Sequence, residues 1–338
     1  MLRMFKLLPL AILALLVAFT VSCEGPAGAD GADGMDGADG ADGADGHLTC
    51  LGCHNDATML DNKLEMARSQ HKLGDIAVNY AGGRASCAQC HGHEGFVEWS
   101  ETGTVAGNYT TPSPWQCSTC HGLHATFEED FTGDDAALRA VGAVTLMFDE
   151  ATEADYGNSN LCINCHQSRR GYASYDDGTG TDVAITSSLA GPHHGPQANL
   201  LMGNNGVTAG SEHAHASVGC AGCHMKETTG DDLDIAGGHT FWPTAEACAD
   251  CHSGADNFDL FSGQTTIQGK LDNLAGLLVT AGVLDSAHHV VVGTYPRAEV
   301  QAWWNWDLVY EDRSLGVHNP TYAKALLDAS ITALGGTP

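Results

Sequence analysis

The pattern of apolar and polar residues differs between the two ends of this 338-residue chain. Near the start, residues 7–19 form one apolar run of 13 residues that follows the basic Arg3 and Lys6. A membrane-spanning helix needs ~20 apolar residues, whereas a shorter run behind a basic segment is typical of an export signal. Residues 1–22 are therefore predicted to be a signal peptide.

Toward the end of the chain, apolar residues recur at helical spacing. Residues 267–281 place apolar side chains mainly three or four positions apart, which is the pattern of one helix face. A second helix is predicted over residues 296–310, because Pro296 suits a first helical turn. A third is predicted after Asn319 and Pro320, a capping residue followed by a proline. Residues 258–338 are therefore predicted to form a helical region.

Residues 47–257 rarely keep a helical or an alternating period over a long stretch. Glycine is also abundant, with 42 copies in the whole chain. We therefore expect loops and short helices in this segment. The predicted fold class is mostly α and irregular coil with little or no β-sheet, and the regular helices are expected at the C-terminal end.

Cysteine and histidine carry the chemistry of residues 47–257. The pattern Cys-x-x-Cys-His occurs six times, whereas the composition predicts only about 0.03 copies. This pattern is the attachment signature of c-type haem, in which two thiols bond the porphyrin and the histidine ligates the iron. The motif residues are Cys50, Cys53 and His54; Cys87, Cys90 and His91; Cys117, Cys120 and His121; Cys162, Cys165 and His166; Cys220, Cys223 and His224; and Cys248, Cys251 and His252.

Zinc sites and disulfides are the alternatives for so many cysteines. In a zinc ribbon the residue after the second cysteine is free to vary, but it is histidine in all six copies here. The motifs use 12 of the 13 cysteines, so only Cys23 remains outside them. We therefore predict six covalently bound haem c groups. Residues 47–338 then supply about 50 residues per haem, so the porphyrins are expected to form much of the core.

The second axial position of each iron needs a further ligand. Six proximal histidines leave 12 of the 18 histidines for this role, and this surplus favours bis-histidine ligation throughout.

Several segments resemble ligand elements of bacterial multihaem c-type cytochromes, and the resemblance covers most of residues 60–335. The matching segments are Ser-Gln-His at 69–71, Gly-Pro-His-His-Gly-Pro-Gln at 191–197, Ser-Glu-His at 211–213, Cys-His-Met at 223–225, Gly-Gly-His-Thr-Phe at 237–241 and residues 312–320. The last segment and its helical surroundings resemble the C-terminal part of pentahaem nitrite reductases and octahaem relatives. From this context, the predicted distal ligands are His71, His124, His194, His213, His239 and His318.

Some of these choices have a close competitor. His193 is the alternative to His194, and His215 is the alternative to His213. His124 is preferred over His93 and His47, and the pair at 288–289 has no assigned role. Because residue 47 lies at the end of a predicted tether, its histidine is also a candidate ligand to a haem of a neighbouring subunit. That arrangement resembles extracellular cytochrome filaments, although a lipid anchor argues against a long free filament.

The segment around Cys23 resembles a bacterial lipoprotein signal, in which the cysteine becomes the lipid-modified first residue. Thr20 departs from the usual leucine of that pattern, and a cleaved signal followed by a free thiol is the alternative. Residues 23–46 continue with a glycine at every third position and six aspartates. The period is that of collagen, but the acidic side chains would repel one another across three chains. We interpret this collagen-like segment as an extended, solvated tether, with a triple helix or a calcium-ordered repeat as the alternatives.

Electron transfer and catalysis are the competing functions. Nitrite reductases usually mark the substrate haem with Cys-x-x-Cys-Lys, and this chain contains no such motif. We therefore expect an electron carrier, with no catalytic residues assigned, that works at the outer membrane or cell surface in anaerobic or extracellular respiration. A reductase of nitrite, hydroxylamine or tetrathionate and the hexahaem subunit of a filament remain the alternatives.

The net charge of −28 narrows the choice of partners. A strongly negative surface disfavours nucleic acid and bare anionic membrane. Other redox proteins, such as periplasmic or outer-membrane cytochromes, and a metal oxide or other extracellular acceptor are compatible with it. We expect an exported outer-membrane lipoprotein, on the periplasmic side or at the cell surface, that touches the membrane through its lipid anchor. A homo-oligomer is also possible.

Overall fold

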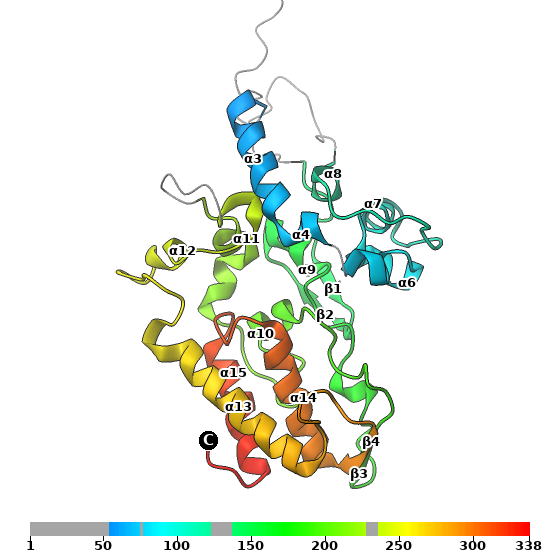
Figure 1. Ribbon diagram of the computed structural model, residues 1–338, viewed down its shortest axis with the longest axis vertical. Coiled ribbons are helices and arrows are strands. Elements are labelled where there is room, and N and C mark those ends of the chain that lie inside the picture. Colours follow the sequence, from blue (N-terminus) through cyan, green and yellow to red (C-terminus); the bar gives the residue numbers. More distant parts are fainter. Residues whose placement is uncertain (1–53, 75–76, 123–136, 228–235) are drawn as a thin grey trace, which may run out of the picture. The chain divides into compact units, whose positions relative to one another are not determined.

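A computed structural model describes residues 54–74, 77–122, 137–227 and 236–338 (Figure 1). The chain divides after Gly46, and every described residue belongs to the second unit, His47–Pro338. The predictions that lie outside the described residues concern the signal peptide, Cys23, the acidic tether, His47, Cys50, Cys53 and His124.

Three long helices form the C-terminal region, as their periodicity predicts. They are α13 (Gly263–Ala281), α14 (Arg297–Asp312) and α15 (Pro320–Ala333), and all three pack against one another (Figure 1). The cap prediction for the last helix is confirmed, because Asn319 Oδ1 accepts a hydrogen bond from the Tyr322 N–H at 3.0 Å.

The main hydrophobic core lies between these helices. It includes Leu274, Leu278, Leu308 and Leu327, each fully buried. The indole N–H of the buried Trp304 donates to a backbone carbonyl outside the helices, that of Asn205, at 2.6 Å. Large aromatic side chains with satisfied polar atoms therefore anchor the helical region to the preceding segment.

Only four short strands occur among the described residues. Strand β1 (Val144–Leu146) pairs with β2 (Asp149–Ala154), and β3 (Asp182–Ile185) pairs with β4 (Gly293–Pro296), both antiparallel. The second pair joins the motif segment to the start of α14 and was not expected within residues 258–338. The predicted fold class, mostly α and coil with little sheet, is confirmed.

Before residue 258 the helices are mostly one or two turns long. They are α3 (Asp56–Arg68), α4 (Gln70–Leu73), α6 (Ala85–His91), α7 (His93–Thr102), α8 (Cys117–Cys120), α9 (Asn160–Ile163), α10 (Gln197–Met202), α11 (Gly219–His224) and α12 (Glu246–Ala249). A π-helical turn covers Val78–Gly82, and short 3₁₀ turns cover Gly157–Ser159, Tyr172–Ser174, Ala214–Ser217, Gly238–Thr240 and Leu260–Ser262. The 13-residue α3 is longer than expected, and Asn55 caps it by accepting from the Thr58 N–H at 2.8 Å.

The motif segment contains little apolar core of its own. Besides the main core, the structure has a second hydrophobic cluster, which lies in this segment and consists of Val144, Leu146, Ala154, Ile163 and Ala198. Such a small cluster cannot by itself stabilise so long a segment, so a further apolar group must be buried within it. This agrees with the expectation that porphyrin forms much of the core.

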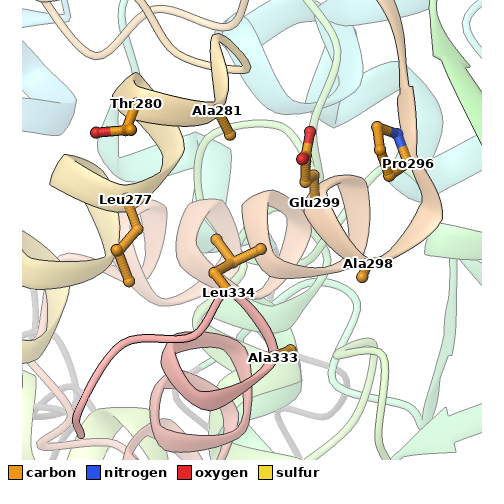
Figure 2. A pocket seen from close by; sticks show the side chains of 8 residues that line it. All are labelled: Leu277, Thr280, Ala281, Pro296, Ala298, Glu299, Ala333 and Leu334. Carbon is orange, nitrogen blue, oxygen red and sulfur yellow. The ribbon is translucent and has the colours of Figure 1, made fainter.

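A surface hollow lies among α13, α14 and α15 (Figure 2). Its lining residues are Leu277, Thr280, Ala281, Pro296, Ala298, Glu299, Ala333 and Leu334. These side chains include no cysteine or histidine. Within the described ranges, no helix is both long and apolar enough to cross a membrane.

Candidate haem sites

The five motifs that the structure describes in full each lie on a turn of helix, in α6, α8, α9, α11 and α12 or at the ends of these helices. The backbone N–H of the motif histidine donates to the carbonyl of the first cysteine, at 2.9 Å for His121 and His166 and at 2.8 Å for His252. Residues three and four apart share a helix face, so both thiols and the imidazole start from the same side of the turn. Of the first motif, only His54 is described.

Each of these five motif histidines has a second histidine beside it, and the distance between the two rings is nearly the same in all five cases. The separations between ring centroids are 5.9 Å for His91 and His193, 6.2 Å for His121 and His239, 6.1 Å for His166 and His71, 6.2 Å for His224 and His318, and 6.2 Å for His252 and His215. We call these the five histidine pairs. The partners come from segments far away in the sequence, so the spacing is a product of the fold.

The spacing fits a metal ion between the two rings. Two metal–nitrogen bonds of about 2 Å, with the distance from each nitrogen to its ring centre added, separate the centroids by about 6 Å. Histidines that are close neighbours in the chain have rings that lie closer together: the His213 and His215 rings are 4.5 Å apart, and the His193 and His194 rings are 5.4 Å apart. The five histidine pairs therefore fit haem iron held from both faces.

Three of the distal ligands predicted from sequence, His71, His239 and His318, are members of these pairs. At two other positions the structure brings a neighbouring histidine to the motif instead of the predicted one. His193 takes this place beside His91, and His215 takes it beside His252. The remaining prediction, for residue 124, lies outside the described part of the chain.

Local geometry explains why the neighbours take these places. His193 has a positive φ of 78°, which turns consecutive side chains in different directions. The His194 side chain is 79% exposed, and its Nδ1–H donates to Glu311 Oε2 at 2.8 Å. His213 caps the 3₁₀ turn Ala214–Ser217, and its Nδ1 accepts from the His215 N–H at 3.3 Å. Sequence proximity alone contains no signal for either choice.

Other histidines have different contacts. His93 Nδ1 lies 2.7 Å from Thr119 Oγ1, which occupies that ring nitrogen. The His288 ring packs edge-on against Trp306 at 6.0 Å, and His289 Nδ1 lies 3.3 Å from Asp285 Oδ2. His93, the alternative to His124, and the unassigned histidines 288 and 289 therefore lie outside the five histidine pairs.

Hydrogen bonds fix the orientation of several paired imidazoles. The Nδ1–H groups of His215 and His224 donate to the backbone carbonyls of Val317 and Phe241, at 2.7 and 2.9 Å. His318 Nδ1–H donates to the carboxylate of Asp312 at 2.6 Å. An occupied Nδ1 leaves Nε2 as the nitrogen available to a metal.

The fourth motif adds an amide contact of the same kind. His166 Nδ1 donates to Gln197 Oε1 at 3.1 Å, and Gln197 Nε2 donates to the Asp312 carbonyl at 3.2 Å. Sequence reasoning also missed these hydrogen bonds to the Nδ1 atoms of the paired histidines.

Burial keeps most of the paired imidazoles neutral, which is the form that ligates a metal. It lowers the pKa of His71 to about 4, with a further contribution from His166. The pKa of His193 is likewise lowered to about 4, first by burial and then by His194. His318 is the exception, because the Asp312 carboxylate raises its pKa although burial acts in the opposite direction.

The motif thiols make contacts between motifs. The Cys90 Sγ donates to the Asn164 carbonyl at 3.7 Å, and the Cys165 Sγ donates to the Gln89 carbonyl at 3.9 Å. Cys162 lowers the pKa of the Cys220 thiol to about 7. The fourth motif, Cys162–His166, thus contacts the second motif and lies near the fifth. All ten described cysteines are free of disulfides, and over the described ranges no group of three His, Cys, Asp or Glu side chains converges on a metal-ion site.

Comparison with known proteins supports this geometry at the level of fold. Neither a protein-family model nor a curated protein matches the sequence. The crystal structure of the outer cell wall cytochrome OcwA is similar with a TM-score of 0.54 and 20% identity, over 81% of this chain and 50% of that chain. The undecahaem cytochrome from the S-layer of Carboxydothermus ferrireducens is similar with a TM-score of 0.50 and 18% identity, over 80% of this chain and 41% of that chain.

The chain has the fold of a multihaem cytochrome. It spans half of the first neighbour and less than half of the second. The helical turns with Cys-x-x-Cys-His and the five histidine pairs are consistent with this fold, because they supply the covalent and axial attachment that such cytochromes require.

Proposed function

We propose that the protein is a hexahaem c-type cytochrome that transfers electrons through bis-histidine haems. The observation that carries this proposal is the set of five histidine pairs, whose ring centroids lie 5.9–6.2 Å apart. In this assignment His71, His193, His215, His239 and His318 are the distal ligands. His54 is the proximal ligand of the haem at the first motif, and His124 is our candidate for its distal ligand.

The chain's own residues divide the work of holding each haem. The two motif thiols would attach it covalently, and the two imidazoles would ligate its iron. Backbone carbonyls and Asp312 orient several imidazoles through Nδ1, so that Nε2 points to the metal. When bound, each haem iron accepts and releases one electron. Filling both axial positions leaves none open to substrate, which suits conduction better than catalysis.

The thiol contacts support a connected path. The fourth motif contacts the second through the bonds from Cys90 to the Asn164 carbonyl and from Cys165 to the Gln89 carbonyl. It lies near enough to the fifth for Cys162 to lower the pKa of Cys220. Because the thiols are the points of haem attachment, these contacts bring neighbouring haem edges together. We therefore infer that the fourth haem lies between the second and the fifth along the path.

We further propose an exported location for this path. The similar structures are described as an outer cell wall protein and an S-layer protein, which supports a place at or outside the cell envelope. The signal peptide would direct export, and a lipid on Cys23 together with the acidic tether would then hold the mature cytochrome near an outer membrane. The net charge of −28 suits a cationic patch on a partner cytochrome or a metal-oxide acceptor.

Low-temperature electron paramagnetic resonance of the fully oxidised protein tests the proposal. The paired rings cross at 34° and 38° in two pairs and at 66°, 83° and 90° in the other three. The low-spin signal becomes more anisotropic as the two imidazole planes approach perpendicular, so the pairs at 83° and 90° are expected to give more anisotropic signals than the tilted pairs at 34° and 38°. A high-spin signal that shifts on addition of nitrite or hydroxylamine would instead show an open iron and favour a reductase.

A further inference from the structure

A buried carboxylate lies beside one of the five histidine pairs. The Asp312 side chain is 0% exposed, and its Oδ1 accepts from His318 Nδ1–H at 2.6 Å. Among the Nδ1 hydrogen bonds described above for the paired histidines, this is the one whose acceptor is a carboxylate. Glu65 accepts the backbone N–H of His239 at 2.8 Å. Glu65 approaches His239 Nδ1 only to 3.7 Å, which is too far for a hydrogen bond. Asp312 is therefore set apart from the neutral acceptors at the other described pairs.

The local fold holds this carboxylate in place. Asp312 is the last residue of α14, and Arg313 turns the chain back with a φ of 64°. The second carboxylate oxygen accepts from the Ser314 N–H at 3.2 Å and also from the Ser314 hydroxyl. The Ser314 hydroxyl in turn accepts from the His318 N–H at 3.3 Å. The loop between α14 and α15 thus closes on itself, with Asp312 and His318 at its two ends.

The same residue contacts the neighbouring motif. The backbone carbonyl of Asp312 accepts from Gln197 Nε2, and Gln197 Oε1 accepts from His166 Nδ1. A hydrogen-bonded series therefore runs from the proximal histidine of the fourth motif to the distal histidine of the fifth. These are also the two motifs in which the Cys162 thiol lowers the pKa of Cys220.

We propose that Asp312 is a positioning residue that orients His318 and lowers the reduction potential of the haem attached at Cys220 and Cys223. This inference rests on the proposed function. A carboxylate that accepts from Nδ1–H makes the imidazole a stronger donor, and the buried negative charge stabilises oxidised iron over reduced iron. The effect is expected to be confined largely to the fifth haem, since His318 is the imidazole to which the carboxylate hydrogen-bonds and the Asp312 charge also acts on its partner His224.

The test is a spectroelectrochemical redox titration of the complete haem-loaded protein with Asp312→Asn. Asparagine keeps the shape but removes the charge, so the reduction equilibrium of one haem should shift at least tenfold toward the reduced form. For a one-electron couple, tenfold corresponds to about 59 mV. The low-spin signal of one haem should also move, while the number of low-spin haems stays constant. Asp285→Asn is the matched control, because it removes the same charge from an exposed Asp–His contact and should leave every potential unchanged.

A second variant should shift the reduction potential of the same haem in the opposite direction. Ser314→Ala removes a hydroxyl donor from the Asp312 carboxylate, so more of the charge acts on His318 and the potential of the same haem should fall. If Asp312→Asn does not mature, this variant decides the question. Unchanged potentials in the variants that mature would overturn the role of Asp312. The haem content is measured on each sample, because a wild-type chain without haem would refute the proposed function, whereas a loaded chain with unmoved potentials would refute this inference alone.

Discussion

Replacing the two adjacent histidines at 193 and 194 one at a time tests the ligand assignment most sharply. The structure places His193 opposite His91, and it places His194 in an ion pair with Glu311. His193→Ala should therefore leave one iron with a single axial histidine, whereas His194→Ala should leave all of the irons in their original state. The sequence predicts the reverse outcome, because residue 194 is the choice that its context favours.

The expected magnitudes follow from the two environments. With six motifs, the loss of one distal ligand converts about one sixth of the iron from low spin to high spin. The His194 side chain is 79% exposed, so breaking its ion pair should lower the unfolding free energy by no more than about 1 kcal/mol. The two variants should thus differ clearly in the spin state of the iron. His194→Ala should lower the stability of the protein only slightly.

Electron paramagnetic resonance and the absorption bands of high-spin haem provide the assay. The double variant of residues 193 and 194 gives the full effect if the remaining histidine moves into the vacated place. His289→Ala is the control, since it removes an exposed histidine paired with Asp285. A high-spin signal in His194→Ala together with an unchanged spectrum in His193→Ala would refute the assignment.

Two further predictions concern the helical region. Asn319 caps α15 and also donates to two backbone carbonyls from the buried interior of the protein, so Asn319→Ala should lower the unfolding free energy by about 1–3 kcal/mol. Asn319→Asp, which keeps the cap acceptor, should recover part of this loss in thermal denaturation, and equal midpoints for the wild type and both variants would contradict the role. Burial, and secondarily Glu311, raises the pKa of Asp307 to about 8 from an ordinary value of 3.8. The folded protein therefore loses stability as pH rises between these values, so Asp307→Asn should gain stability relative to the wild type from pH 5 to pH 8, and a pH-independent difference would contradict this reasoning.

Much of the fold follows from short-range signals in the sequence. The apolar spacing of residues 267–281 predicts α13, and Asn319 with Pro320 marks the start of α15, because caps and periodicity act within one or two turns. The expectation of short helices in residues 47–257 is likewise met by the helical turns on which the five described motifs lie. The pairing of β3 with β4 was missed, because strands so far apart in the sequence find each other through tertiary packing.

The candidate site likewise combines features that the sequence predicts with features that only the structure shows. The motifs identify the proximal histidines, but the choice between His213 and His215 depends on which way a 3₁₀ turn aims its side chains. The contact between Asp312 and His318 depends on a left-handed residue, Arg313, that periodicity does not reveal. The pairing of His71 with His166 depends on the whole path of the intervening chain. Local chemistry is thus readable from sequence, whereas the partners across each pair require the three-dimensional structure.

Mass spectrometry of the mature, denatured protein tests the central claim most directly. Covalent attachment at all six motifs predicts a chain that carries six haem masses and keeps them through denaturation, with a matching pyridine haemochrome spectrum. A chain that carries zinc, disulfides or markedly fewer than six haems would contradict it.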